Sequence, residues 1–123
     1  MTPDRNPVGL RHWKWLPGMR VSHFTQGYAR VLVGGDNLLL FSEHDRRLFH
    51  VLADTEEWRL DGDDPASLGC LLDLASTAWQ TPLHLKFEWL GYCTVITPHG
   101  KVVGAGTSYA SALLAALENA PAG

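Results

Sequence analysis

The chain has 123 residues, of which 46% are hydrophobic, and it contains five tryptophans, a composition that excludes an intrinsically disordered protein. This length suits one domain, which can bury enough surface to fold without disulfides or a structural metal. The formal net charge of −3 disfavours a nucleic-acid partner.

No apolar run approaches the roughly 18 residues of a membrane span, and Met1–Arg5 lacks the apolar core of a signal peptide. We therefore expect a cytoplasmic protein that makes no membrane contact. The two cysteines, Cys70 and Cys93, form no CxxC pair, and we expect them to act as small apolar side chains.

The charges are unevenly distributed along the chain. Residues 1–53 carry seven basic and four acidic side chains, whereas residues 54–64 carry six acidic side chains and one arginine. Residues 65–123 carry only five charged side chains, which is few for a freely solvated monomer. We expect three segments within one compact domain: an N-terminal β-meander with a short arm (1–53), an acidic connection (54–64) and an α-β-β-α unit (65–123).

The N-terminal segment shows the alternation of short strands. Residues 11–16 alternate with period two, which predicts a strand with Trp13 and Trp15 on one face. Polar and glycine-rich turns separate the further strands. These are expected at residues 19–24, 28–33, 38–41 and 48–52. The pattern predicts an antiparallel meander of three to five strands, for which an SH3-like arrangement is one form.

The acidic connection ends in a helix start. Asp64 suits the N-cap and Pro65 suits the first helical position, so a helix is expected over residues 65–79. One face carries Leu68, Leu71, Leu72, Ala75 and Trp79. Cys70, Leu74 and Thr77 point the other way, so we expect this helix to contact protein on both sides.

The rest of the chain predicts an antiparallel sheet and a second helix. Residues 83–89 alternate as a half-buried strand with Leu83, Leu85, Phe87 and Trp89 on the inner face. Gly91 marks a turn, and strands follow at residues 92–97 and 102–104. A helix over 107–118 with Thr107 as N-cap should bury Tyr109 and Leu113. No acidic residue follows Thr107 closely, so no capping box is expected.

Residues 64–119 carry a resemblance to a known family. The Asp64–Leu72 segment opens the first helix, and Gly106-Thr107 starts the Ala/Leu-rich final helix. Together they resemble small uncharacterised proteins of tailed phages and prophages whose α-β-β-α unit is known as the phage ABA sandwich. The resemblance implies an α+β fold with two helices packed on an antiparallel sheet, and a phage or prophage setting. It implies no chemistry, because every matching residue has a packing or capping role.

The sequence predicts no catalytic residue, no cofactor and no metal site. The six histidines do not fall into zinc-ligand spacings, and neither cysteine lies in a nucleophile motif. The glycine pairs lack the residues of a phosphate-binding loop. We therefore expect a protein that is not an enzyme.

Two surfaces remain as candidate binding sites. One is the aromatic and basic stretch with Arg11, Trp13, Trp15 and Arg20, a composition typical of single-strand nucleic-acid binding but also of a covered core. The other is the uncharged outer side of the helices at Cys70, Leu74 and Leu114.

Three functional hypotheses follow. The first is a phage-type accessory protein that binds a host or phage protein, as a homo-oligomer, with inhibition of a host system as one form. The second is a small-ligand or nucleotide-sequestering protein that uses Thr107-Ser108 and Arg46-Arg47. The third is a single-strand nucleic-acid binder.

Overall fold

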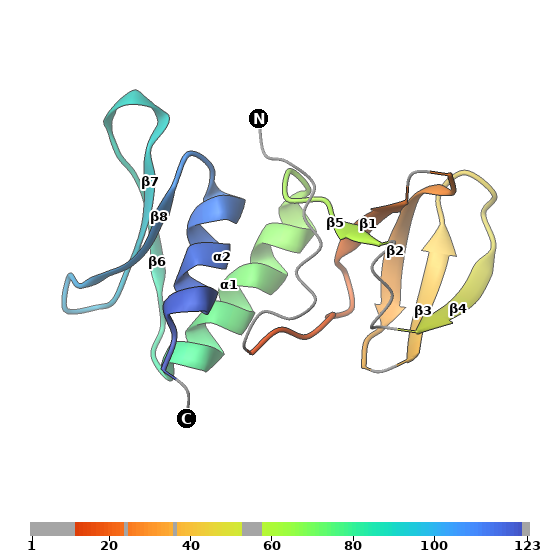
Figure 1. The fold of residues 1–123 in the computed structure, drawn as a ribbon, viewed down its shortest axis with the longest axis horizontal. Coiled ribbons are helices and arrows are strands. Elements are labelled where there is room, and N and C mark those ends of the chain that lie inside the picture. Colours follow the sequence, from red (N-terminus) through yellow and green to blue (C-terminus); the bar gives the residue numbers. More distant parts are fainter. Residues whose placement is uncertain (1–11, 24, 36, 53–57, 122–123) are drawn as a thin grey trace.

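The computed structural model describes residues 12–23, 25–35, 37–52 and 58–121, and in these ranges the fold is α+β, as the sequence predicts. Two antiparallel sheets lie at opposite ends of the molecule, and two helices lie between them (Figure 1). The first sheet contains β1 (Arg20–His23), β2 (Gly27–Val33), β3 (Asn37–Ser42), β4 (Leu48–Leu52) and β5 (Arg59–Leu60). The second part contains α1 (Pro65–Trp79), β6 (His84–Phe87), the 3-10 turn η1 (Trp89–Gly91), β7 (Cys93–Ile96), β8 (Val102–Gly106) and α2 (Tyr109–Asn119).

The first sheet is the predicted antiparallel meander. Among the described residues it has five strands, the upper limit of the expected number, with β5 in place of the strand expected at residues 11–16. The strand order is β4-β3-β2-β1-β5, so the last strand returns beside the first. The prediction of a solvated connection over residues 54–64 is wrong for its second half. Trp58, Leu60 and Asp61 are buried, and Leu60 pairs with Val21 of β1. Residues 54–57 of that connection lie outside the described residues.

The strand predicted at residues 11–16 does not form over its described part, residues 12–16. The reason lies in the sheet, because β1 already has β2 on one side and β5 on the other. This segment instead passes alongside α1, where Cys70 Sγ lies 3.4 Å from the carbonyl oxygen of Pro17. The period-two pattern therefore reflects the packing of two tryptophans rather than strand pairing.

Helix α1 begins and ends where the sequence predicts. The carboxylate of Asp64 accepts a hydrogen bond from the backbone N–H of Ser67 at 3.0 Å, and Pro65 occupies the first turn. Gln80, in the left-handed region with φ of 56°, ends the helix. This capping defines the helix at both ends without an acidic or basic residue in its first or last turn.

The start of α2 differs from the prediction. Its N-cap is Ser108 instead of Thr107, and a capping box forms although none is expected. The Ser108 hydroxyl accepts from the Ser111 N–H, and the Ser111 hydroxyl accepts from the Ser108 N–H, both at 3.1 Å. A serine hydroxyl at the third helical position thus replaces the usual Glu or Gln carboxylate or amide.

The helices stack in layers on the second sheet. Helix α2 packs on β8 and β7, and α1 packs on α2 (Figure 1). Glycines of β8 permit this close approach: a Cβ at Gly104 would lie 2.4 Å from the carbonyl oxygen of Ala112 and 2.6 Å from the Ala116 nitrogen. Buried apolar side chains from both sheets and both helices form one cluster.

Charged groups join the meander to the start of α1. Arg30 of β2 binds the carboxylate of Asp64 at 2.6 and 3.2 Å. Arg20 of β1 binds Asp61 at 2.8 Å and Glu43 at 2.9 Å, and its backbone N–H donates to the Ser67 hydroxyl at 2.8 Å. The first turn of α1 is therefore held by two neighbouring strands.

The contact between α2 and β8 predicts opposite effects for two glycine substitutions. We expect Gly104→Ala to lower the free energy of unfolding by roughly 1–3 kcal/mol, because its methyl group would overlap the α2 backbone. Gly69→Ala, in α1 where a Cβ meets nothing within 4 Å, should raise it by about 0.5–1 kcal/mol. Urea unfolding followed by tryptophan fluorescence measures both, and an unchanged Gly104→Ala variant would contradict this packing.

The Arg30–Asp64 pair predicts that the contact between the meander and α1 weakens at acid pH. Burial raises the pKa of the Asp64 carboxyl, but hydrogen bonds from Arg30 and Ser67 outweigh this effect and leave the pKa below its usual value. The pKa of the Asp64 carboxyl is therefore lower in the folded chain than in the unfolded chain. Its contribution to stability is fully present above the unfolded-state pKa of about 4, and it is lost as the pH falls through the folded-state pKa.

We expect Asp64→Asn to lower the free energy of unfolding at pH 7 by about 1–2 kcal/mol, because asparagine still caps the helix but cannot form the ion pair. Urea unfolding between pH 7 and pH 3 should show a smaller loss of stability for this variant than for the wild type. Asp63→Asn, at an exposed neighbouring carboxylate, should follow the wild-type curve. Parallel curves for Asp64→Asn and the wild type would contradict the role of the pair.

Candidate functional site

The aromatic and basic stretch predicted as a nucleic-acid surface is partly buried in the protein. Trp15 is only 4% exposed, and its ring meets that of Trp13 edge to face at 5.2 Å between centroids. Arg20 is bound by Glu43 and Asp61, and its guanidinium lies 3.8 Å from the centre of the Tyr28 ring. Arg11 lies outside the described residues. Trp15 is thus a core residue, which removes one of the two rings proposed for base stacking.

The uncharged helix surface predicted at Cys70, Leu74 and Leu114 is also covered. Leu74 and Leu114 are buried and belong to the core cluster, and Cys70 is partly buried. Burial raises the pKa of the Cys70 thiol, so the protonated form is favoured. Cys70 and Leu74 are covered although they lie off the main apolar face of α1, because α2 packs on one side of this helix and the segment before β1 lies on the other.

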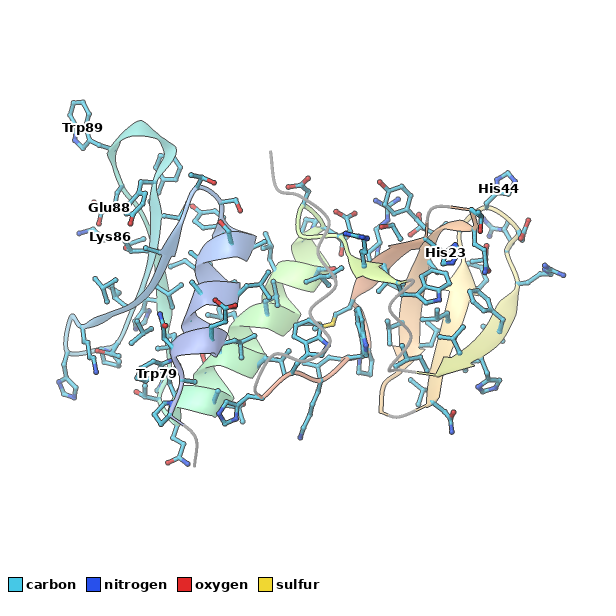
Figure 2. All side chains as sticks on the ribbon, in the orientation of Figure 1. His23, His44, Trp79, Lys86, Glu88 and Trp89 are labelled. Atoms are coloured by element: carbon cyan, nitrogen blue, oxygen red, sulfur yellow. The ribbon has the colours of Figure 1, made fainter. Side chains whose placement is uncertain are left out.

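Four exposed aromatic side chains gather elsewhere, at and beside the turn end of the hairpin formed by β6, η1 and β7. Phe87 is 63% exposed, Trp89 87% and Tyr92 47%. Tyr109, the first residue of α2, is 38% exposed, and its ring meets that of Phe87 at 6.5 Å and 70°. We call these four residues the aromatic corner. Figure 2 shows Trp89 projecting from the end of the hairpin, away from both helices.

The hairpin geometry holds the aromatic corner in place. The Glu88 N–H donates to the Tyr92 carbonyl at 2.6 Å, and the Tyr92 N–H donates to the Trp89 carbonyl at 3.3 Å. Gly91 has a φ of 74°, a conformation that glycine adopts without strain and that this tight turn requires. Two backbone hydrogen bonds therefore close the turn, and Trp89 projects from it (Figure 2).

The aromatic corner corrects the prediction for residues 83–89. Leu83 is buried and Leu85 partly buried as expected, but Phe87 and Trp89 are not half-buried on an inner face. The strand ends at Phe87, and the covering helix α2 begins only at Tyr109, so Phe87 lies at the limit of the covered area. Tyr109 is likewise exposed instead of buried.

A charged pair lies next to the aromatic corner on the other face of β6. Lys86 Nζ lies 3.4 Å from the Glu88 carboxylate, and both side chains are exposed. Cross-strand pairing aligns Lys86 with Thr94 and Ala105, on the face that points away from α2 (Figure 2). The hairpin therefore presents aromatic residues and a pair of opposite charges side by side.

The groups predicted for a small ligand are already engaged. The Ser108 and Ser111 side chains occupy backbone N–H groups at the start of α2, where an anion would bind. Arg47 contacts Asp45 at 3.6 Å, and Arg46 lies 6.0 Å from the centre of the Phe41 ring. The hollows found among the described residues are open ones, such as that lined by Tyr28, Glu43 and His44.

Within the described ranges, no three His, Cys, Asp or Glu side chains are placed to hold a metal ion. In the same ranges, neither helix is long and apolar enough to cross a membrane. Comparison with protein families, with curated proteins and with solved structures finds no match. The phage-family resemblance of residues 64–119 therefore stays a prediction.

The placement of the tryptophans predicts contrasting substitutions. Trp15→Ala should lower the free energy of unfolding by about 3–5 kcal/mol, because it removes a large buried ring. Trp89→Ala should change it by no more than about 0.5 kcal/mol, since that side chain is almost fully exposed. Thermal and urea unfolding followed by far-UV circular dichroism report both values. A strongly destabilised Trp89→Ala variant would show that Trp89 packs against the protein in solution.

Proposed function

We propose that the chain is a non-catalytic cytoplasmic binding protein that recognises a protein partner through the aromatic corner. The observation that carries this proposal is the exposure of Trp89 on a hairpin that also exposes Phe87 and Tyr92, with the exposed Tyr109 of α2 against Phe87. Exposed aromatic side chains gathered at one end of a folded protein commonly mark an interaction site.

The residue types of the corner suit recognition of a protein. Trp and Tyr are enriched among the residues that contribute most to protein–protein binding, because each buries a large area at a low cost in side-chain entropy. Lys86 and Glu88 would lie at the polar rim that surrounds such an apolar centre. The hairpin is braced by its own hydrogen bonds, so little ordering would oppose binding.

The resemblance of residues 64–119 to phage and prophage proteins supports an accessory role in a phage or prophage. In that setting the partner would be a host or phage protein, and blocking a host system is one form that the contact would take. The burial of Trp15 favours this proposal over single-strand nucleic-acid binding.

Affinity capture with the purified chain tests the proposal. The wild type, Trp89→Ala and Leu48→Ala are immobilised separately and exposed to the same lysate of the cell that carries the gene. Leu48 is the matched control, because it is 59% exposed but lies in the meander. We expect a protein that the wild type and Leu48→Ala retain and that Trp89→Ala loses.

The retained protein is then purified, and its affinity is measured by isothermal titration calorimetry. Trp89→Ala should weaken binding at least tenfold, as expected for a residue at the centre of an interface. Equal dissociation constants for the wild type and Trp89→Ala would overturn the aromatic corner as the binding site.

A further inference from the structure

Among the described residues, strand β6 is an edge of the second sheet, because the strand order is β6-β7-β8. Within these ranges it pairs with β7 alone, which leaves backbone groups on its other side unpaired. The Glu88 N–H points toward β7, where it meets the Tyr92 carbonyl. Backbone directions alternate along a strand, so Lys86 also faces β7, and the N–H and C=O groups of Leu85 and Phe87 point outward.

The other edge of the same sheet is partly closed. The side-chain amide of Asn119 donates to the Val103 carbonyl at 3.0 Å, at a point where β8 is bulged. On β6, the Ser76 hydroxyl accepts from the Leu83 N–H at 3.2 Å, but it reaches only the residue before the strand. An open edge beside exposed apolar residues is a template for pairing with another strand.

Lys86 of β6 and Glu88, the residue that directly follows β6, are complementary in charge to the same residues of a second copy. A two-fold axis at Phe87 would set two β6 strands antiparallel, with Phe87 opposite Phe87 of the second copy. Each Lys86 would then lie opposite Glu88 of the other copy, which gives two favourable cross-strand pairs. This register also lets the outward N–H and C=O groups of the two Phe87 residues bond to each other.

Neighbouring registers are less favourable. A shift that keeps the outward backbone groups facing each other places either Lys86 opposite Lys86 or Glu88 opposite Glu88 of the second copy. Like charges directly opposite each other destabilise a strand pair. Of these three registers, the one centred on Phe87 is therefore the one that places opposite charges across from each other.

We propose that the chain forms a two-fold symmetric dimer in which β6 pairs with β6 of a second copy, centred on Phe87, so that the two three-stranded sheets become one of six strands. This inference rests on the proposed role of the aromatic corner as an interaction surface, and it names a second copy of the chain as the partner that binds there. Pairing covers the exposed Phe87 ring and brings the remaining aromatic side chains of the two corners onto one assembly.

Charge reversal tests the register. Sedimentation equilibrium of the wild type should show a dimer of two 13.6 kDa chains. Lys86→Glu alone and Glu88→Lys alone should each raise the dissociation constant of the dimer about tenfold or more. The two-fold symmetry places two like-charged cross-strand pairs in the dimer of either variant. An equimolar mixture of the two variants should form a heterodimer of near wild-type affinity, since every cross-strand pair is then again of opposite charge.

Arg47→Glu is the matched control, because Arg47 is an exposed cation on the meander, and it should leave the dimer unchanged. The recovery in the mixture shows that both single variants are folded. A wild type that stays monomeric at the highest attainable concentration overturns the proposal, as does a dimer that resists both charge reversals. A monomer whose partner binding still depends on Trp89 would reject the dimer and leave the proposed function standing.

Discussion

The ion pair between Arg30 and Asp64 is the contact on which the rest of the arrangement depends. Asp64 caps α1 through the Ser67 N–H and binds Arg30 of the meander with the same carboxylate. One side chain therefore both starts the helix and sets where that helix lies relative to β2. Because the Arg20 backbone also donates to Ser67, the first turn of α1 has little freedom to move against the sheet.

This position of α1 explains why the C-terminal half contains so few charges. Helix α1 lies between α2 and the segment that precedes β1, so residues on two of its sides are removed from water. Leu74, which lies off the main apolar face, is buried for this reason. A charge-poor helix would indicate a docking surface in an isolated α-β-β-α unit, but here the chain's own N-terminal segment covers it.

Local patterns predicted the elements well. Residue types at the start of α1, and the glycine and proline turns, act over a few residues, and they place the helix at 65–79 and the strand at 48–52 correctly. Long-range pairing is harder to predict. Strand β5 has two residues in an acidic stretch, and it exists because β1 offers an open edge nearly forty residues earlier in the sequence.

The candidate site was missed for a related reason. Alternation shows which side chains share a face, but it does not show how far the covering helix extends over that face. Phe87 lies on the same face as Leu85, yet α2 begins at Tyr109, beside Phe87, and covers only the part of the sheet from there to Leu83. One signal was present: Gly91 marks a turn, and a strand that reaches its turn carries its last residues beyond the core.

The limited extent of α2 over the second sheet also determines what the β6–β7 hairpin exposes. The glycines of β8 let α2 sit so close to the sheet that its small alanine-rich surface suffices to cover the centre. A helix with such a small surface covers little area beyond its own axis, so the far end of the outer strand β6 stays uncovered and its aromatic rings are exposed. The unpaired backbone groups of the same strand have a separate cause, which is its edge position in the strand order β6-β7-β8 of the described residues.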